Sequence, residues 1–208
     1  MSIADFSPRI TETRSHIIAA TRREIDKKGI LGLRVQDVAE HAHVSVPLIY
    51  KYFGDRDGLL SEVLVGMFDE FVKEQVDVAR KIFRAIPNPT ARDLLPIFHV
   101  PNEPSRSSSR WANLQTMAAS VDIPSLRARL GEVQVASIAY VADFLDEVQI
   151  RLTGAINTSS RELALFIRAY AFGFAQNDLL TEQGQSINTD LYVDLMFDTF
   201  ERAIFPKK

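Results

Sequence analysis

The stretch of sequence that decides the fold is residues 34–53, which read RVQDVAEHAHVSVPLIYKYF. Apolar residues recur in its first part at spacings of three and four, at Val35, Val38 and Ala39. That spacing places the three side chains on one face of a short helix. The pattern then breaks at residues 42–44, which predicts a turn.

A second short helix is predicted to begin directly after this turn. Ser45 is a favourable N-cap, because its hydroxyl can accept an N–H that has no partner in the first helical turn. Pro47 suits that first turn, where its missing N–H is not needed. Val44 and Ile49 are expected to point to a small core shared by the two helices. Two short helices joined by such a turn form a helix-turn-helix.

The remainder of the chain predicts an all-α fold. Apolar residues recur at three and four, period-2 runs are short, and the nine prolines fall mostly where helices should stop or start. This pattern indicates a small N-terminal helical unit followed by a larger helical body. Helices are expected at about 10–28, 35–42, 46–52, 56–85, 90–99, 107–121, 125–151, 159–181 and 189–204.

Composition excludes several classes of protein. Among 208 residues, 46% are hydrophobic and 25% are charged, which is typical of a folded globular chain. No uncharged apolar stretch approaches the 18 residues of a membrane span, and the N-terminus lacks a secretory pattern. The chain contains no cysteine, which excludes disulfides and thiolate metal sites. A cytoplasmic protein is therefore expected.

The N-terminal third resembles the DNA-binding unit of the tetracycline-repressor (TetR) family of bacterial transcriptional regulators. The resemblance implies a helix-turn-helix DNA-binding domain at 11–71 and a ligand-binding and dimerisation domain at 72–208, with about nine helices in all. It rests on residues that agree with the family in order and spacing: Ile17-Ile18, Gly29, Val38-Ala39, Val44-Ser45, Ile49-Tyr50, Tyr52-Phe53, Arg56-Asp57 and Leu59-Leu60.

Three positions depart from the family pattern. His43 stands where the turn glycine is usual, and histidine is one of the few other residue types that tolerate a positive φ. Arg34 replaces the usual Ser or Thr, which removes a helix cap. Pro47 replaces a small residue and, with Val46 and Leu48, makes the base-reading surface unusually apolar.

The resemblance implies that residues 46–52 form a recognition helix that lies in the major groove. Its apolar side chains suit thymine methyl groups, and Lys51 suits guanine. Arg56, at the start of the fourth helix, is expected to hold a phosphate together with free N–H groups there. The residues expected to contact DNA are Arg34, Gln36, Ser45, Val46, Pro47, Leu48, Tyr50, Lys51, Tyr52 and Arg56. For Lys51 a solvated side chain is the alternative, and Tyr52 can instead pack inside the domain.

Two helices near the C-terminus, 159–181 and 189–204, are predicted to hold two copies together as a homodimer. The first is apolar nearly all round at residues 163–175, where only Arg168 is charged, and the second carries two apolar stripes. Two copies are needed because one short helix reads only a few base pairs, so a palindromic operator is expected. A buried helix pair in a monomer is the alternative.

A pocket for a small molecule is expected in the larger domain, because such pockets are mostly apolar with a few polar anchors. Arg168 and Asn177 are the candidate anchors, and an ordinary packed core is the alternative for every residue. The candidate lining is Phe98, Trp111, Met117, Tyr140, Phe144, Phe166, Arg168, Tyr170, Phe174 and Asn177.

The predicted function is a sequence-specific transcriptional regulator, a repressor released from DNA by a small, largely apolar effector. No catalytic residue, metal site or cofactor is expected, because Gly-rich phosphate loops, nucleophile motifs and metal-binding histidine spacings are absent from the sequence. A sensor or interaction module that has lost DNA recognition is the alternative.

Overall fold

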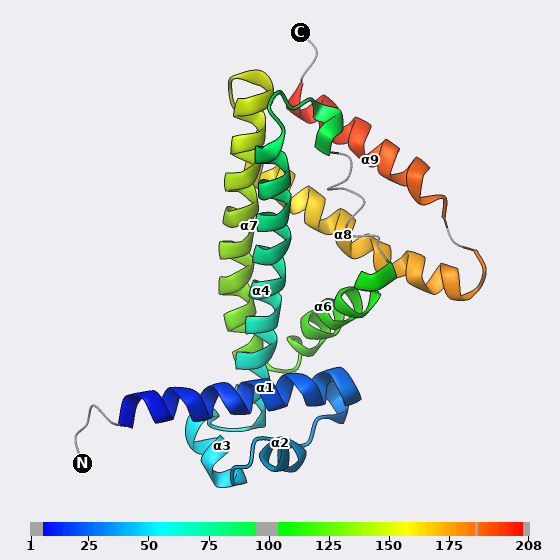
Figure 1. Ribbon diagram of the computed structural model, residues 1–208. Helices are drawn as coiled ribbons and strands as arrows, with labels where there is room; N and C mark the ends of the chain where they lie inside the picture. Colours follow the sequence, from blue (N-terminus) through cyan, green and yellow to red (C-terminus); the bar gives the residue numbers. More distant parts are fainter. Residues whose placement is uncertain (1–5, 95–103, 186, 206–208) are drawn as a thin grey trace. The chain divides into compact units, whose positions relative to one another are not determined.

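The structure, a computed structural model, describes residues 6–94, 104–185 and 187–205 (Figure 1). Within these ranges the chain is helical and contains no strand, so the predicted all-α fold is confirmed. The elements are α1 (Phe6–Gly32), α2 (Val35–His41), α3 (Val46–Phe53), α4 (Arg56–Ala85), the 3-10 helices η2 (Ala91–Leu94) and η4 (Pro104–Arg106), α6 (Ser107–Ala119), α7 (Pro124–Thr153), α8 (Ser160–Glu182) and α9 (Thr189–Ile204).

The expected helices differ from the observed ones in two places. α1 is longer than expected and is interrupted at Gly29, whose φ of 71° is accessible to glycine but strained for other residues. Of the helix expected at 90–99, the first part is the short η2, and its remainder from residue 95 lies outside the described residues.

The chain divides into two compact units. The first comprises the chain up to Phe68 together with Gln115–Val133, and the second comprises Asp69–Leu114 together with the chain from Gln134 onward. The segment Gln115–Val133, which the sequence analysis placed in the larger domain, thus belongs to the first unit. The predicted boundary between residues 71 and 72 divides the chain only once. It does not describe the first unit, which contains two segments that are separate in sequence.

Hydrogen bonds and burial explain why the start of α7 belongs to the first unit. Ser61 on α4 and Ser125 on α7 are joined through their hydroxyl oxygens at 3.0 Å. Leu126 and Leu130 are both buried, and Arg129 forms an ion pair with Glu62 at 2.8 Å. These contacts hold the start of α7 against α4.

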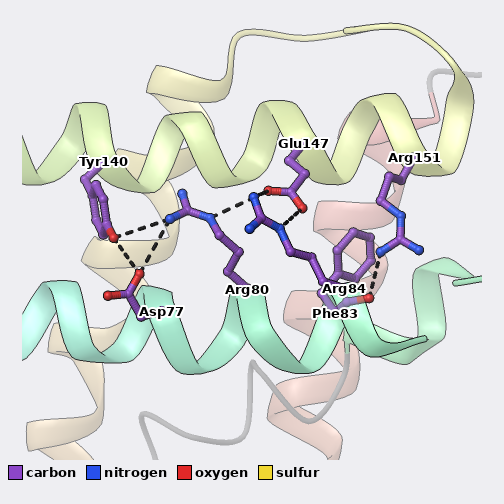
Figure 2. Close-up of polar contacts among 7 residues, drawn as sticks. All are labelled: Asp77, Arg80, Phe83, Arg84, Tyr140, Glu147 and Arg151. Carbon is purple, nitrogen blue, oxygen red and sulfur yellow. Dashed lines mark hydrogen bonds and ion pairs between the residues drawn. The ribbon is translucent and has the colours of Figure 1, made fainter. Parts of the chain in front are cut away.

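The second unit is built around one hydrophobic core to which α4, η2, α7, α8 and α9 all contribute. Polar contacts join α4 to α7 along one side (Figure 2). Arg84 donates two hydrogen bonds to the carboxylate of Glu147, at 2.6 and 2.8 Å. Arg151 donates to the carbonyls of Phe83 and Ile86, both at 2.8 Å, and so satisfies acceptors at the C-terminal end of α4.

An ion pair between a buried arginine and a partly buried aspartate joins α6 to α8 within the second unit. The guanidinium of Arg110, whose side chain is 7% exposed, donates from Nε to Asp178 at 3.0 Å and makes a second contact through Nη2. Ser107 donates to the same carboxylate at 3.0 Å. The hydrogen bond from Arg110 lowers the pKa of Asp178 below its ordinary value of 3.8.

Asp178→Asn should lower the free energy of unfolding at pH 7 by about 2–3 kcal/mol, because it leaves the buried Arg110 charge without its carboxylate. The contribution of a carboxylate with a lowered folded-state pKa is complete above its unfolded value and is lost as the pH falls through the folded value. Urea unfolding followed by circular dichroism should therefore show a difference between wild type and variant that shrinks from pH 7 to pH 3.

The matched control is Asp143→Asn, because Asp143 is exposed on the neighbouring helix α7. This control should leave the free energy of unfolding unchanged. A difference for Asp178→Asn that is absent at pH 7, or equally large at both pH values, would contradict a stabilising role for the ion pair.

Candidate nucleic-acid interface

α2 and α3 are joined by a turn whose geometry matches the sequence pattern. Val35, Val38 and Ala39 on α2 are buried, and Ile49 on α3 is 0% exposed. His43 has a φ of 54°, which confirms that the position of the missing glycine requires a positive φ. The two short helices are thus packed together through one apolar side each.

Ser45 occupies the N-cap position of α3, as predicted, but its side chain makes no capping hydrogen bond. The prediction that its hydroxyl caps the helix is therefore wrong. The carbonyl of Ser45 accepts hydrogen bonds from Leu48 and Ile49 at 3.0 and 3.2 Å, so the backbone begins the helix without the side chain. The Ser45 side chain stays on the exposed surface at the start of α3.

The ten residues predicted to contact DNA all lie in the first unit, and none of them is fully buried. Val46, Leu48, Tyr52 and Arg56 are half-buried; Arg34, Gln36, Ser45, Pro47, Tyr50 and Lys51 are exposed. Because Ile49 fixes the inner side of α3, the residues on either side of it in sequence are held at or near the surface. The surface of α3 therefore combines apolar side chains with a phenol and an ammonium group.

A charged cluster that the sequence did not predict joins α1 to α2. The ammonium of Lys28 contacts the carboxylates of Glu24 at 2.7 Å and Asp37 at 2.6 Å, and His41 Nδ1 lies 3.2 Å from Glu24. Hydrogen bonding between Lys28 and Asp37 raises the pKa of Lys28 and lowers that of Asp37. The only sequence signal for this cluster was the i,i+4 spacing of Glu24 and Lys28.

A second charged cluster links α1 with α4 and α7. Glu62 on α4 receives Arg14 from α1 at 2.7 Å and Arg129 from α7 at 2.8 Å. Burial alone would raise the pKa of Glu62, but the hydrogen bonds from the two arginines outweigh it and lower the pKa. Arg14 also lies over the ring of Phe53, at the end of α3, with 5.3 Å between guanidinium carbon and ring centroid.

The start of α4 differs from the predicted phosphate site. The N–H of Gly58 donates to the carboxylate of Asp55 at 2.7 Å, so the expectation of free N–H groups is wrong at this residue. A Cβ at Gly58 would lie 2.0 Å from the carbonyl oxygen of Phe53, so only glycine fits there. Arg56 donates to the carbonyls of Ile30 at 3.2 Å and Leu33 at 3.4 Å.

The residues predicted to line an effector pocket are dispersed. Phe98 lies outside the described residues, and Met117 belongs to the first unit, whereas the other eight belong to the second. Phe144, Tyr170 and Phe174 are buried in the hydrophobic core of the second unit. The rings of Tyr170 and Phe174 meet edge to face, with centroids 4.9 Å apart. Burial raises the pKa of Tyr170.

The remaining pocket candidates have different environments. Asn177, predicted as a polar anchor, accepts a hydrogen bond from the N–H of Ile187 at 3.0 Å. Tyr140 donates to Asp77 and accepts from Arg80 at 3.3 Å, within the contacts between α4 and α7 (Figure 2). Phe166 is 42% exposed, and Trp111 is half-buried. Burial lowers the pKa of Arg168, also half-buried, to about 10.

One groove of about 550 Å³ in the second unit includes none of the predicted pocket residues. Its lining is Pro89, Thr90, Ala91, Leu152, Glu201, Arg202 and Phe205.

In the part of the chain that the structure describes, no three His, Asp or Glu side chains are placed to share a metal ion. The helices described there are also too short or too polar to span a membrane.

Comparison with known proteins points to one family. Residues 17–63 match the sequence profile of the bacterial regulatory proteins of the tetR family. The HTH-type transcriptional regulator BetI of Burkholderia thailandensis is 41% identical over 51 residues. That match covers 24% of this chain and only 26% of the BetI protein's length.

Solved structures extend the similarity over nearly the whole chain. A Rhodococcus sp. protein assigned to the TetR family of transcriptional regulators is 28% identical, with a TM-score of 0.62 over 93% of this chain and 99% of that one. A transcriptional regulator from Saccharomonospora viridis, solved in complex with choline, shares the fold at 20% identity, with a TM-score of 0.59 over 95% and 97% of the two chains. The profile match and the BetI similarity agree with the helix-turn-helix geometry, and residues 17–63 form a DNA-binding unit of the kind found in bacterial regulatory proteins of the tetR family, while the chain as a whole shares the fold of the solved TetR-family structure.

Proposed function

We propose that this protein is a sequence-specific DNA-binding transcriptional regulator, a repressor that leaves its operator when a small, largely apolar effector binds. It acts in the cytoplasm, without a catalytic step or a cofactor. The observation that carries the proposal is the two-sided character of α3: Ile49 is fully buried, whereas Tyr50 is 41% exposed and Lys51 is exposed. A helix anchored in this way can enter a major groove without unfolding the domain that supports it.

Different side chains at the surface of α2 and α3 are suited to contact bases and the DNA backbone. Lys51 is placed to donate to a base edge or a phosphate, and Tyr50 can donate to a phosphate through its hydroxyl. Val46, Pro47 and Leu48 are suited to thymine methyl groups. Arg34 and Gln36, both exposed at the start of α2, can contact the DNA backbone.

We propose that two copies associate through α8 and α9. These helices carry large apolar side chains that the rest of the described chain leaves exposed, which include Leu165 (57%), Leu191 (67%) and Leu195 (65%). Exposed apolar side chains grouped on neighbouring elements are typical of an association surface. A two-fold dimer would present two copies of α3 to a palindromic operator.

An effector that binds the second unit can change DNA binding by the first unit only if the two units are physically linked. The helices α4 and α7 provide a covalent link, because each has residues in both units. α4 contributes residues 56–68 to the first unit and 69–85 to the second. α7 is divided in the same way, and its first part carries the Arg129 partner of Glu62. The effector must bind the DNA-incompetent state more tightly than the competent one, because equal affinity for both shifts nothing.

The effector site is proposed for the second unit, and the candidates there that lie outside its buried core are Trp111, Tyr140, Phe166, Arg168 and Asn177. A second candidate function is a small-molecule sensor or interaction module that has lost DNA recognition. The apolar side chains at the start of α3 favour this alternative. Absence of salt-dependent duplex binding by the wild-type protein would favour this second function.

Lys51→Ala should weaken operator binding and reduce the steepness of its salt dependence. Each lost phosphate contact removes about 0.9 from the slope of log K against log salt concentration. The measurement is a titration by fluorescence anisotropy, between 50 and 200 mM salt, of a duplex selected with the wild-type protein. Lys81→Ala is the matched control, because Lys81 is an exposed lysine of the second unit. Equal slopes for wild type and Lys51→Ala would argue against a phosphate contact.

The double variant Leu191→Glu with Leu195→Glu should be monomeric, because buried charges at an interface are costly to desolvate. Analytical ultracentrifugation measures its mass, and circular dichroism checks that it stays helical. The corresponding change at Ile150, which is 52% exposed on α7, should leave the dimer intact. A double variant that remains dimeric would place the interface elsewhere.

A further inference from the structure

We propose that Arg56 is a positioning residue, which fixes the start of α2 by binding backbone carbonyls, and not a phosphate ligand. This inference rests on the proposed DNA-binding function and assigns one residue of that site a different role. The observation behind it is that the guanidinium of Arg56 donates from Nη2 to the carbonyl of Ile30 and from Nε to that of Leu33, at 3.2 and 3.4 Å.

The two carbonyls lie where the chain passes from α1 to α2. Regular helical geometry is interrupted at Gly29, and α2 begins only at Val35. Carbonyls at the end of a helix lose their helical partners and need other donors. Ile30 and Leu33 are themselves 5% and 3% exposed, so the junction is anchored by apolar side chains and by Arg56 together.

The groups around Arg56 disfavour a phosphate. Asp57 lies 3.6 Å from its Nη1, and Asp55 accepts the N–H of Gly58 at 2.7 Å. Two carboxylates therefore stand on the same turn as Arg56, and they repel an approaching phosphate. The N–H of Gly58, which would otherwise favour an anion at this helix N-terminus, is already bonded.

The role of Arg56 depends on the shape of its side chain as well as on its charge. A planar guanidinium can bind two carbonyls at once, whereas the single ammonium of lysine does not reproduce this fork. Phosphate contacts, in contrast, depend mainly on positive charge and are retained in part by lysine. Arg56→Lys therefore separates the two roles.

The test compares Arg56→Lys and Arg56→Ala in binding to a duplex selected from a random-sequence pool with the wild-type protein. Both variants should bind about tenfold more weakly, as expected for the loss of hydrogen bonds from a charged donor. Both should keep the wild-type slope of log K against log salt concentration, whereas Lys51→Ala lowers it. Near-wild-type affinity for Arg56→Lys, with a slope reduced by about 0.9 for Arg56→Ala, would overturn the inference.

A second measurement needs no DNA. Amide hydrogen exchange of residues 30–36 in the free protein should be faster in both variants than in wild type, while exchange in α8 stays unchanged. Wild-type exchange in both variants would overturn the inference. If the wild-type protein binds no duplex at all, the proposed function fails, and this exchange measurement alone still decides the role of Arg56.

Discussion

The burial of Ile49 is the interaction on which the rest of the first unit depends. It fixes one side of α3, an eight-residue helix that is too short to be stable alone. Truncation of a buried isoleucine to alanine typically costs about 2–5 kcal/mol, which is a large share of the stability of a small domain. The exposed side chains of α3, Pro47, Tyr50 and Lys51, therefore depend on the burial of Ile49 for their positions.

The fold was largely predictable because local signals agree. Apolar spacing, the Pro47 position and the break at residues 42–44 all predicted two short helices, and the all-α class followed from the same periodicity along the chain. The inclusion of Gln115–Val133 in the first unit was not predictable, because it depends on long-range contacts such as Arg129 with Glu62. Periodicity shows which side of a helix is apolar, and it does not identify the partner of that side.

In the candidate site, the exposure of the residues was more predictable than their contacts. The exposure of Tyr50 and Lys51 followed from their position relative to Ile49. The hydrogen bonds of Arg56 to Ile30 and Leu33 join residues more than twenty positions apart, and no local pattern specifies them. For the effector pocket, aromatic residues at helical spacing, such as Phe144, proved to lie in the core, because the same pattern serves both purposes.

We propose that α3 enters a major groove and that two copies of the protein bind a palindromic site together. Repeated selection of duplexes from a random-sequence pool by the wild-type protein, followed by sequencing, tests it most directly. We expect an enriched palindrome whose half-sites lie one helical turn apart, about 10–10.5 base pairs between centres, or a multiple of that spacing. A pool that stays random after selection at low salt would contradict it.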